Sequence, residues 1–207
     1  IMVSALLGAR LLYVVVEYKY FWAYPLEIFK FWKGGLVFYG GLILGVLVSL
    51  WYLNRHHMPV WKTADLLVPS IAIGQAIGRW GCLFAGCCYG KETDAIFGIT
   101  FTNPRSLAPL ETSLHPTQIY LSLNALFIFI FLMILSKKKV FDGQVLWSYG
   151  ILYSIGRFLI EYFRGDDRGF PLEQLLSTSQ FVGIFIFLLS SFMLLVLYRK
   201  NLRSHHS

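Results

Sequence analysis

Six long apolar stretches constrain the fold of this chain more than any other feature of its sequence. Most of them hold about 20 residues, enough to cross a hydrocarbon core of ~30 Å at a helical rise of about 1.5 Å per residue. Apolar residues make up 57% of the sequence and charged residues only 14%, which is unlike a soluble domain. The sequence predicts an all-α polytopic membrane protein with about six transmembrane helices, folded as a single domain over residues 1–207. The stretches are 1–16, 34–53, 65–86, 116–135, 143–163 and 179–198.

Basic residues gather in the short connections between these stretches and at the C-terminus. They include Arg55, Lys62, Lys137, Lys138, Lys139, Arg199, Lys200 and Arg203. The longer connections (17–33, 87–115 and 164–178) carry acidic and basic residues in similar numbers. The positive-inside rule therefore places the short connections and the C-terminus in the cytoplasm. The net charge of +7 indicates topology and gives no support for nucleic-acid binding, because the basic residues form no continuous stripe.

The first apolar stretch begins at Ile1, already inside a helical pattern and without a basic segment or cleavage site before it. An even number of helices with a cytoplasmic C-terminus would place Ile1 on the cytoplasmic side. We expect one further transmembrane helix upstream of Ile1.

A permanent charge lies within the third apolar stretch, in the segment GQAIGRWGCLFAGCCYG. Arg79 cannot lose its proton, so at membrane depth it must face a polar cavity, pair with an acid or bind an anion. Glycines at 74, 78, 81, 86 and 90 allow a backbone or a ligand to approach closely. This combination favours a phosphate-bearing substrate held within the bilayer, with Gly78 and Gly81 beside it.

Two further arginines lie at membrane depth, and one of them has an acid on the same helix face. Arg157, Glu161 and Arg164 are spaced i, i+4 and i+7. Glu161 is expected to neutralise Arg157, to orient it or to act as a base, and a purely structural ion pair is the alternative. Arg10, in LLGARLLY, adds another cation. Several cations in one helical bundle suit a lipid phosphate, so Arg10 and Arg164 are also candidate substrate-binding residues.

Two aromatic or imidazole side chains are candidates for proton transfer or positioning. His115 opens the segment HPTQIY before Pro116, which suits the first position of a helix, and Gln118 and Tyr120 follow as polar groups at the interface. A cap or hydrogen-bond partner is the simpler role for His115. Tyr39 stands between two glycine pairs, where a catalytic role and a place in an aromatic belt are both open.

The cysteines Cys82, Cys87 and Cys88 are not expected to bind a metal. Their spacing is not the C-x₂-C of a zinc site, and no matching set of His or Cys residues is found elsewhere in the sequence. A disulfide from Cys82 to either neighbour and free thiols are both possible.

Four motifs, in order, resemble those of the bacterial prolipoprotein diacylglyceryl transferases: GGLVFYGGLILG, IGRWGCLFAGCCYG, HPTQIY and GRFLIEYFRGDD. GARLLY near the start is similar to part of the family's second membrane helix. The resemblance implies transfer of a diacylglyceryl group from phosphatidylglycerol to the lipobox cysteine of a preprolipoprotein signal peptide. A thioether forms and glycerol phosphate leaves, on the outer side of the bacterial inner membrane. The reaction implied needs no cofactor, and its partners are membrane lipid and the prelipoprotein.

The resemblance also assigns roles to individual residues. It implies that Arg79 binds the lipid headgroup, that Arg157 is a second essential arginine and that Glu161 is the acid one turn later. His115, Gln118 and Tyr120 match the family's HPxQxY motif.

The chain departs from the family pattern at four positions. Tyr39 stands where many members have a histidine, Leu121 replaces an acid, and Cys82 and Cys87 replace an asparagine and a glutamate. The proton acceptor is therefore open between Tyr39, His115 and no base at all, with Tyr39 favoured as a positioning hydroxyl. Two other functions remain as alternatives: a non-catalytic or repurposed relative, and a transporter with intramembrane arginines, although no internal repeat supports the latter.

Overall fold

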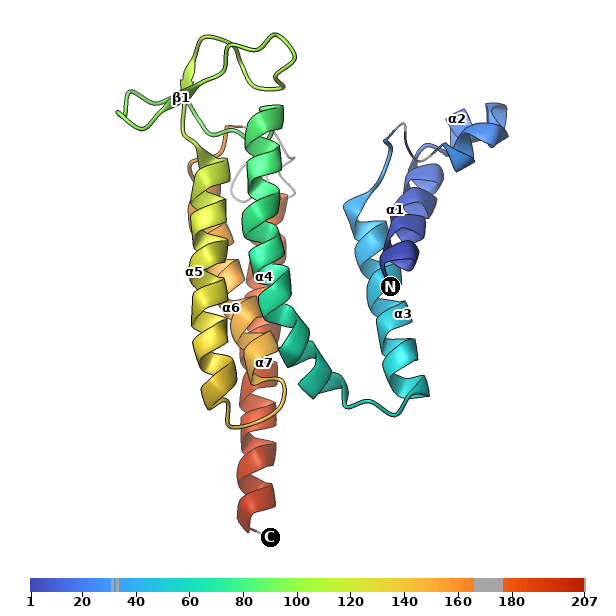
Figure 1. Ribbon diagram of the computed structural model, residues 1–207, viewed down its shortest axis with the longest axis vertical. Coiled ribbons are helices and arrows are strands. Elements are labelled where there is room, and N and C mark those ends of the chain that lie inside the picture. Colours follow the sequence, from blue (N-terminus) through green and yellow to red (C-terminus); the bar gives the residue numbers. More distant parts are fainter. Residues whose placement is uncertain (31, 33, 166–176, 207) are drawn as a thin grey trace. The chain divides into compact units, whose positions relative to one another are not determined.

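The computed structural model describes residues 1–30, 32, 34–165 and 177–206. The chain divides into two compact units, Ile1–Val60 (the first unit) and Trp61–Ser207 (the second unit). Each unit is built from helices, as Figure 1 shows. The single domain over residues 1–207 stays a prediction.

The first unit is a helical hairpin with a folded connection. It contains α1 (Met2–Val16), α2 (Tyr18–Ala23), a 3₁₀ helix (Pro25–Phe29) and α3 (Phe38–Arg55). A Cβ on Gly8 of α1 would collide with the carbonyl of Gly40 on α3, and the reverse also holds. The two helices therefore approach at backbone distance, as small residues permit between membrane helices.

The second unit is an up-and-down bundle of four helices. These are α4 (Val60–Ala85), α5 (Thr117–Lys138), α6 (Gln144–Glu161) and α7 (Thr178–His206). Polar contacts tie α4 to its neighbours: Ser122 Oγ donates to the Ala76 carbonyl at 2.8 Å, and Tyr149 Oη donates to Gln75 Oε1 at 2.9 Å. The buried apolar core lies in the half of the bundle where α5 ends and α6 begins. It consists of Val68, Ala72, Ile128, Leu132 and Val145.

A small sheet closes the end of the second unit where α4 and α6 finish and α5 and α7 begin, which we call the sheet end. Strands β1 (Ile99–Thr100) and β2 (Ser113–Leu114) pair antiparallel. The segment 89–93 runs beside them: Gly90 N–H donates to the His115 carbonyl at 3.0 Å, and Lys91 N–H donates to the Phe163 carbonyl at 2.8 Å. This one segment therefore holds the start of α5 and the end of α6 together.

At the opposite end of the second unit, which we call the lysine end, a buried carboxylate organises the turn before α6. The Asp65 side chain is 3% exposed, and it accepts hydrogen bonds from the backbone amides of Gly143 and Leu146 at 2.8 and 3.0 Å. Lys139 Nζ lies 3.1 Å from the same carboxylate. Burial lowers the pKa of Lys139, but hydrogen bonds and charge from Asp142 and Asp65 outweigh this and leave it raised. Asp65 thus satisfies amides that a helix start leaves unpaired.

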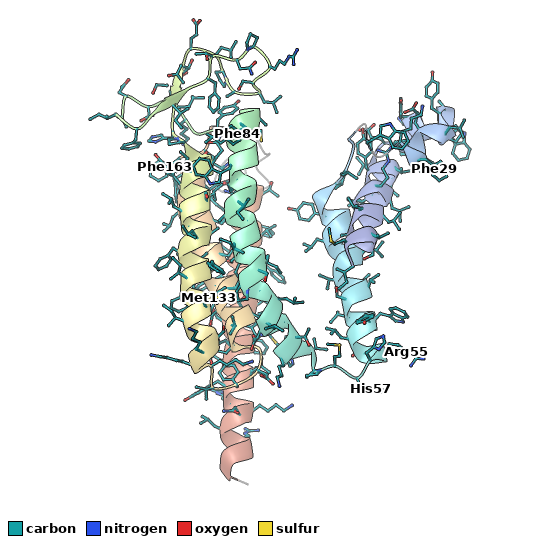
Figure 2. The ribbon with its side chains drawn as sticks, in the orientation of Figure 1. Phe29, Arg55, His57, Phe84, Met133 and Phe163 are labelled. Atoms are coloured by element: carbon teal, nitrogen blue, oxygen red, sulfur yellow. The ribbon has the colours of Figure 1, made fainter. Side chains whose placement is uncertain are left out.

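Each of the six predicted apolar stretches forms a helix. Within the described residues, three segments are long and apolar enough to span a membrane, namely Val60–Ala85, Thr117–Lys138 and Thr178–Arg203. The count of six transmembrane helices is therefore not confirmed. Many large apolar side chains are exposed, among them Phe84 at 84% and Met133 at 42%, both labelled in Figure 2. Such a surface suits lipid.

We predict that Asp65→Ala destabilises the protein by about 3 kcal/mol, because two backbone amides lose their acceptor and Lys139 loses the more buried of its two carboxylate partners. The measurement is thermal unfolding of the purified protein in detergent. Asp142→Ala is the matched control: its carboxylate also binds Lys139, at 2.8 Å, but is 49% exposed. We expect at most about 1 kcal/mol for this exposed pair. Equal losses in the two variants would contradict the role assigned to Asp65.

Candidate functional site

Glu161, in the last turn of α6, lies between two arginines at the sheet end. Its Oε2 is 2.5 Å from Arg157 Nη1 and 3.9 Å from Arg164 Nε. The three side chains are each less than 10% exposed. The i, i+4 and i+7 spacing thus produces one buried ionic cluster, in which the carboxylate offsets the cost of burying the guanidinium groups.

The start of α7 completes this cluster. Ser177 Oγ donates to Glu161 Oε1 at 2.8 Å, and Arg157 Nη2 donates to Ser179 Oγ at 2.9 Å. Ser177 and Gln180 also form a reciprocal capping box, in which each side chain accepts a hydrogen bond from the backbone amide of the other, at 3.1 and 3.2 Å. The helix cap therefore fixes the geometry of the ionic cluster. Part of the GRFLIEYFRGDD motif, residues 166 and 167, falls outside the described residues.

His115 and Tyr120 lie in an aromatic recess of about 440 Å³ beside another face of α6. His115 Nδ1 is 3.1 Å from Tyr120 Oη, and the Phe163 ring packs edge-on against the imidazole at a centroid distance of 5.3 Å. From α6, Leu159 and Ile160 line this recess. On a helix with 3.6 residues per turn, Leu159 points about 160° away from both Arg157 and Glu161, whereas Ile160 is about 60° from Arg157 and about 100° from Glu161. His115 and the ionic cluster thus occupy different sides of α6.

The end of α4 is a Schellman turn that brings the cysteines together. Gly86 N–H donates to the Leu83 carbonyl at 3.1 Å, Cys87 N–H donates to the Cys82 carbonyl at 3.1 Å, and Gly86 has φ +67°. A left-handed glycine of this kind commonly ends a helix. The turn brings Cys87, the residue after the glycine, next to Cys82, five positions earlier. The Sγ atoms of Cys82, Cys87 and Cys88 all lie within 4.8 Å of one another.

The HPTQIY segment holds this turn in place. Gln118 Nε2 donates to the Cys87 carbonyl at 2.8 Å, and Thr117 Oγ donates to the Cys88 carbonyl at 2.7 Å. Both side chains are fully buried. Gln118 was predicted to bind substrate, and in this structure its amide supports the backbone of the glycine-rich motif. Its substrate role stays a prediction.

Arg79 is half-buried in the last two turns of α4 and makes no hydrogen bond or ion pair with the described residues of the second unit. At Gly78 and Gly81, no atom in the described part of that unit lies within 4 Å of where a Cβ would stand. These glycines therefore leave open space beside the arginine. Binding of an anion by Arg79 stays a prediction.

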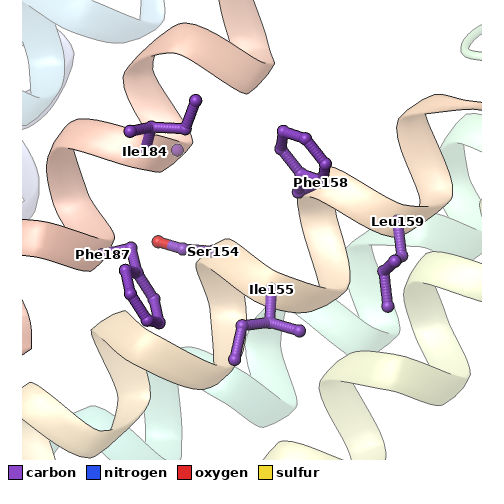
Figure 3. A pocket seen from close by; sticks show the side chains of 7 residues that line it. Ser154, Ile155, Phe158, Leu159, Ile184 and Phe187 are labelled. Carbon is purple, nitrogen blue, oxygen red and sulfur yellow. The ribbon is translucent and has the colours of Figure 1, made fainter.

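A narrow apolar groove lies between α6 and α7, below the ionic cluster. It has a volume of about 180 Å³, and Figure 3 shows its lining side chains. Ser154, Phe158, Ile184 and Phe187 are among them. Its lining suits hydrocarbon rather than a polar ligand.

Arg10 is buried in the first unit, and its donors are already used. All five N–H groups of its guanidinium reach backbone carbonyls in the connection between α1 and α3. The rings of Tyr13 and Phe21 lie 5.6 and 5.3 Å from its Cζ. Arg10 thus anchors this connection, which no sequence motif indicated. A role in substrate binding stays a prediction and would require these bonds to exchange.

Tyr39 stands in the first turn of α3, also in the first unit, with its side chain 55% exposed. Within the second unit, the structure joins Arg157, Glu161 and Arg164 in one cluster, and it joins His115 to Tyr120. It shows no described contact between Arg79 and Arg157. A common cavity for these two arginines stays a prediction.

The sequence analysis missed Ser177, Ser179 and Gln180. The signal was present, because a Ser-x-x-Gln pattern directly before an apolar run is typical of a helix start. Nothing comparable in the sequence identified Ser179 as the hydrogen-bond partner of Arg157.

The fold and the site together define a helical membrane protein with an arginine–glutamate cluster at one end of its bundle. The family model described as prolipoprotein diacylglyceryl transferase matches residues 1–196. The chain therefore belongs to the prolipoprotein diacylglyceryl transferase family.

Several curated relatives are similar over most of the chain. The phosphatidylglycerol–prolipoprotein diacylglyceryl transferase of Clostridium tetani (strain Massachusetts / E88) is 41% identical over 190 residues, which cover 92% of this chain and 75% of that protein. Transferase 2 of Clostridium perfringens (strain 13 / Type A) is 42% identical over 184 residues, covering 89% and 71%. The transferase of Dehalococcoides mccartyi (strain ATCC BAA-2266 / KCTC 15142 / 195) is 35% identical over 189 residues, covering 90% and 70%.

We predict that Glu161→Gln lowers stability by about 3–5 kcal/mol, because two buried guanidinium groups lose the carboxylate between them. The check is thermal unfolding in detergent, with Glu92→Gln as the control on the neighbouring loop, where the side chain is exposed. Identical melting of the two variants would show that the cluster does not depend on this charge.

Proposed function

We propose that the protein transfers the diacylglyceryl group of phosphatidylglycerol to the lipobox cysteine of preprolipoprotein signal peptides. The thiolate sulfur forms a C–S bond with the terminal glycerol carbon, and the C–O bond to the phosphate breaks. The bonding electrons leave with glycerol phosphate, and the thiol proton passes to a base or to solvent. The family membership and the names of the relatives support this reaction.

The observation that carries the proposal is the half-buried Arg79 on an apolar helix with open space at Gly78 and Gly81. A guanidinium is suited to bidentate contact with a phosphate group. Negative charge grows on the leaving phosphate in the transition state, so a cation already directed at it lowers the barrier. The low dielectric constant of the surrounding bilayer strengthens this effect.

The remaining groups receive supporting roles. Arg157, oriented by Glu161 and Ser179, is a second cation for the headgroup, and Arg164 lies on the same carboxylate. His115 and Tyr120 lie in the recess next to α6, where an extended peptide or an acyl chain fits. The groove at Phe158 and Phe187 suits the hydrocarbon of the donor lipid.

The membrane orientation follows from charge. Lys137 and Lys138 lie in the last turn of α5 at the lysine end, and Arg199 and Lys200 lie near the end of α7. We place this end in the cytoplasm of the bacterial inner membrane and the sheet end on the outer side, where signal peptides arrive.

We predict that Arg79→Ala lowers transfer by at least about a hundredfold, since it removes the phosphate contact made in the transition state. Arg79→Lys recovers little, because an ammonium cannot reproduce the planar two-donor fork. The assay detects the mass increase of a lipobox peptide incubated with phosphatidylglycerol. Arg105→Ala, at an exposed loop position, serves as the control and keeps wild-type activity. Normal transfer by the Ala variant would refute the assignment.

We predict different responses from the two candidate proton acceptors. If His115 is the base, His115→Gln removes the rise of rate with pH and costs about 10²-fold or more. We expect Tyr39→Phe to lower the rate less and to leave the shape of the pH–rate profile intact, as befits a positioning hydroxyl. Complete loss in Tyr39→Phe together with a normal profile in His115→Gln would reverse these roles.

A further inference from the structure

The three cysteines of the chain form one cluster at the end of α4. Their Sγ atoms lie within 4.8 Å of one another, and all three side chains are half-buried. The spacing of Cys82, Cys87 and Cys88 gave no reason to expect a metal, since it is not C-x₂-C. The Schellman turn removes that objection, because it brings positions i and i+5 into contact.

The distances suit a metal with thiolate ligands. A zinc–sulfur bond of about 2.3 Å places three sulfur ligands about 4 Å apart, so the cluster needs sub-ångström adjustment rather than rebuilding. Soft thiolates select thiophilic cations over Mg²⁺ or Ca²⁺.

The backbone around the cluster is held in advance. Gly86 and Cys88 both have left-handed backbone conformations, with φ of +67° and +62°. Such a conformation is uncommon for a residue other than glycine. The carbonyls of Cys87 and Cys88 are fixed by the buried Gln118 and Thr117 at 2.8 and 2.7 Å. A Cβ at Gly86 would overlap Ser106 Oγ, so the loop also closes over this turn.

We propose that Cys82, Cys87 and Cys88 bind one Zn²⁺ ion through three thiolates, with a fourth coordination position open to water or to an external ligand. This proposal does not rest on the transfer reaction proposed above. Three protein ligands and an open position are the arrangement found in zinc sites that exchange ligands.

Binding at this site depends on pH. The thiolate and not the thiol binds a metal, so each cysteine must lose its proton on binding. A divalent cation removes the repulsion between the sulfurs and displaces their protons. Zn²⁺ affinity therefore rises with pH, and binding releases protons.

The test uses the full chain, purified in detergent under reducing conditions and freed of metal. Zn²⁺ is titrated with measurement of bound metal and released protons, and Co²⁺ is used as a spectroscopic probe. We expect one ion per chain and a near-ultraviolet thiolate-to-cobalt charge-transfer band. The chain has three cysteines, so this band can arise from no other residues. Cys87→Ser should weaken Zn²⁺ binding by more than about a hundredfold, since it removes the central thiolate.

The control is the double variant His56→Gln/His57→Gln, which removes two exposed histidines of the first unit and should leave binding unchanged. Absence of the cobalt band in the reduced wild-type protein would overturn the proposal without need of a variant. A cobalt band or a Zn²⁺ stoichiometry that Cys87→Ser leaves unchanged would also overturn it. The same holds if mass spectrometry detects a disulfide that persists under reduction. None of these readouts uses transfer activity, so failure here is distinguishable from failure of the proposed function.

Discussion

The interaction on which the sheet end depends is the ion pair between Glu161 and Arg157. A guanidinium buried in a helical bundle is costly unless a carboxylate and hydrogen-bond acceptors surround it. Glu161 supplies the carboxylate from the next turn of the same helix, and Ser177 and Ser179 supply hydroxyls from the start of α7. Because the capping box that starts α7 also uses Ser177, the position of that helix and the orientation of Arg157 are coupled. A disturbance of either is expected to move the other.

A second constraint is the extended segment 89–93, which follows the Schellman turn. It pairs with residues 113–115 on one side and with residues 163–165 on the other. Three of the sequence motifs thus meet through backbone hydrogen bonds, and the side chains of Thr117 and Gln118 add two more contacts to the cysteine turn. The motifs carry structural as well as chemical information. Gln118 illustrates this, since its amide holds the Cys87 carbonyl.

The first unit also contains a buried arginine, whose charge is satisfied in another way. Its buried Arg10 donates to five backbone carbonyls, which satisfy the guanidinium. Carbonyls buried in an irregular connection lack the partners that a helix or sheet provides, so the cation and the connection stabilise each other. Arginines that lie in similar apolar segments of the sequence therefore have different surroundings in the structure. Arg10 organises the backbone and Arg157 belongs to an ionic cluster, whereas Arg79 has no hydrogen bond or ion pair with the described residues of the second unit.

The sequence by itself determined the helical membrane class, the position of each main helix and the shared face of Arg157, Glu161 and Arg164, because hydropathy and the 3.6-residue repeat are local properties. It also carried the family resemblance, which the comparisons confirm. Tertiary structure decided which neighbours each charge has: Asp65 meets Gly143 and Leu146 from 78 and 81 residues away. It likewise decided that Cys82, Cys87 and Cys88 meet, since their contact depends on a left-handed turn at Gly86 and on hydrogen bonds from α5. Such partners are set by packing between segments distant in the sequence, and no periodicity within one segment encodes them.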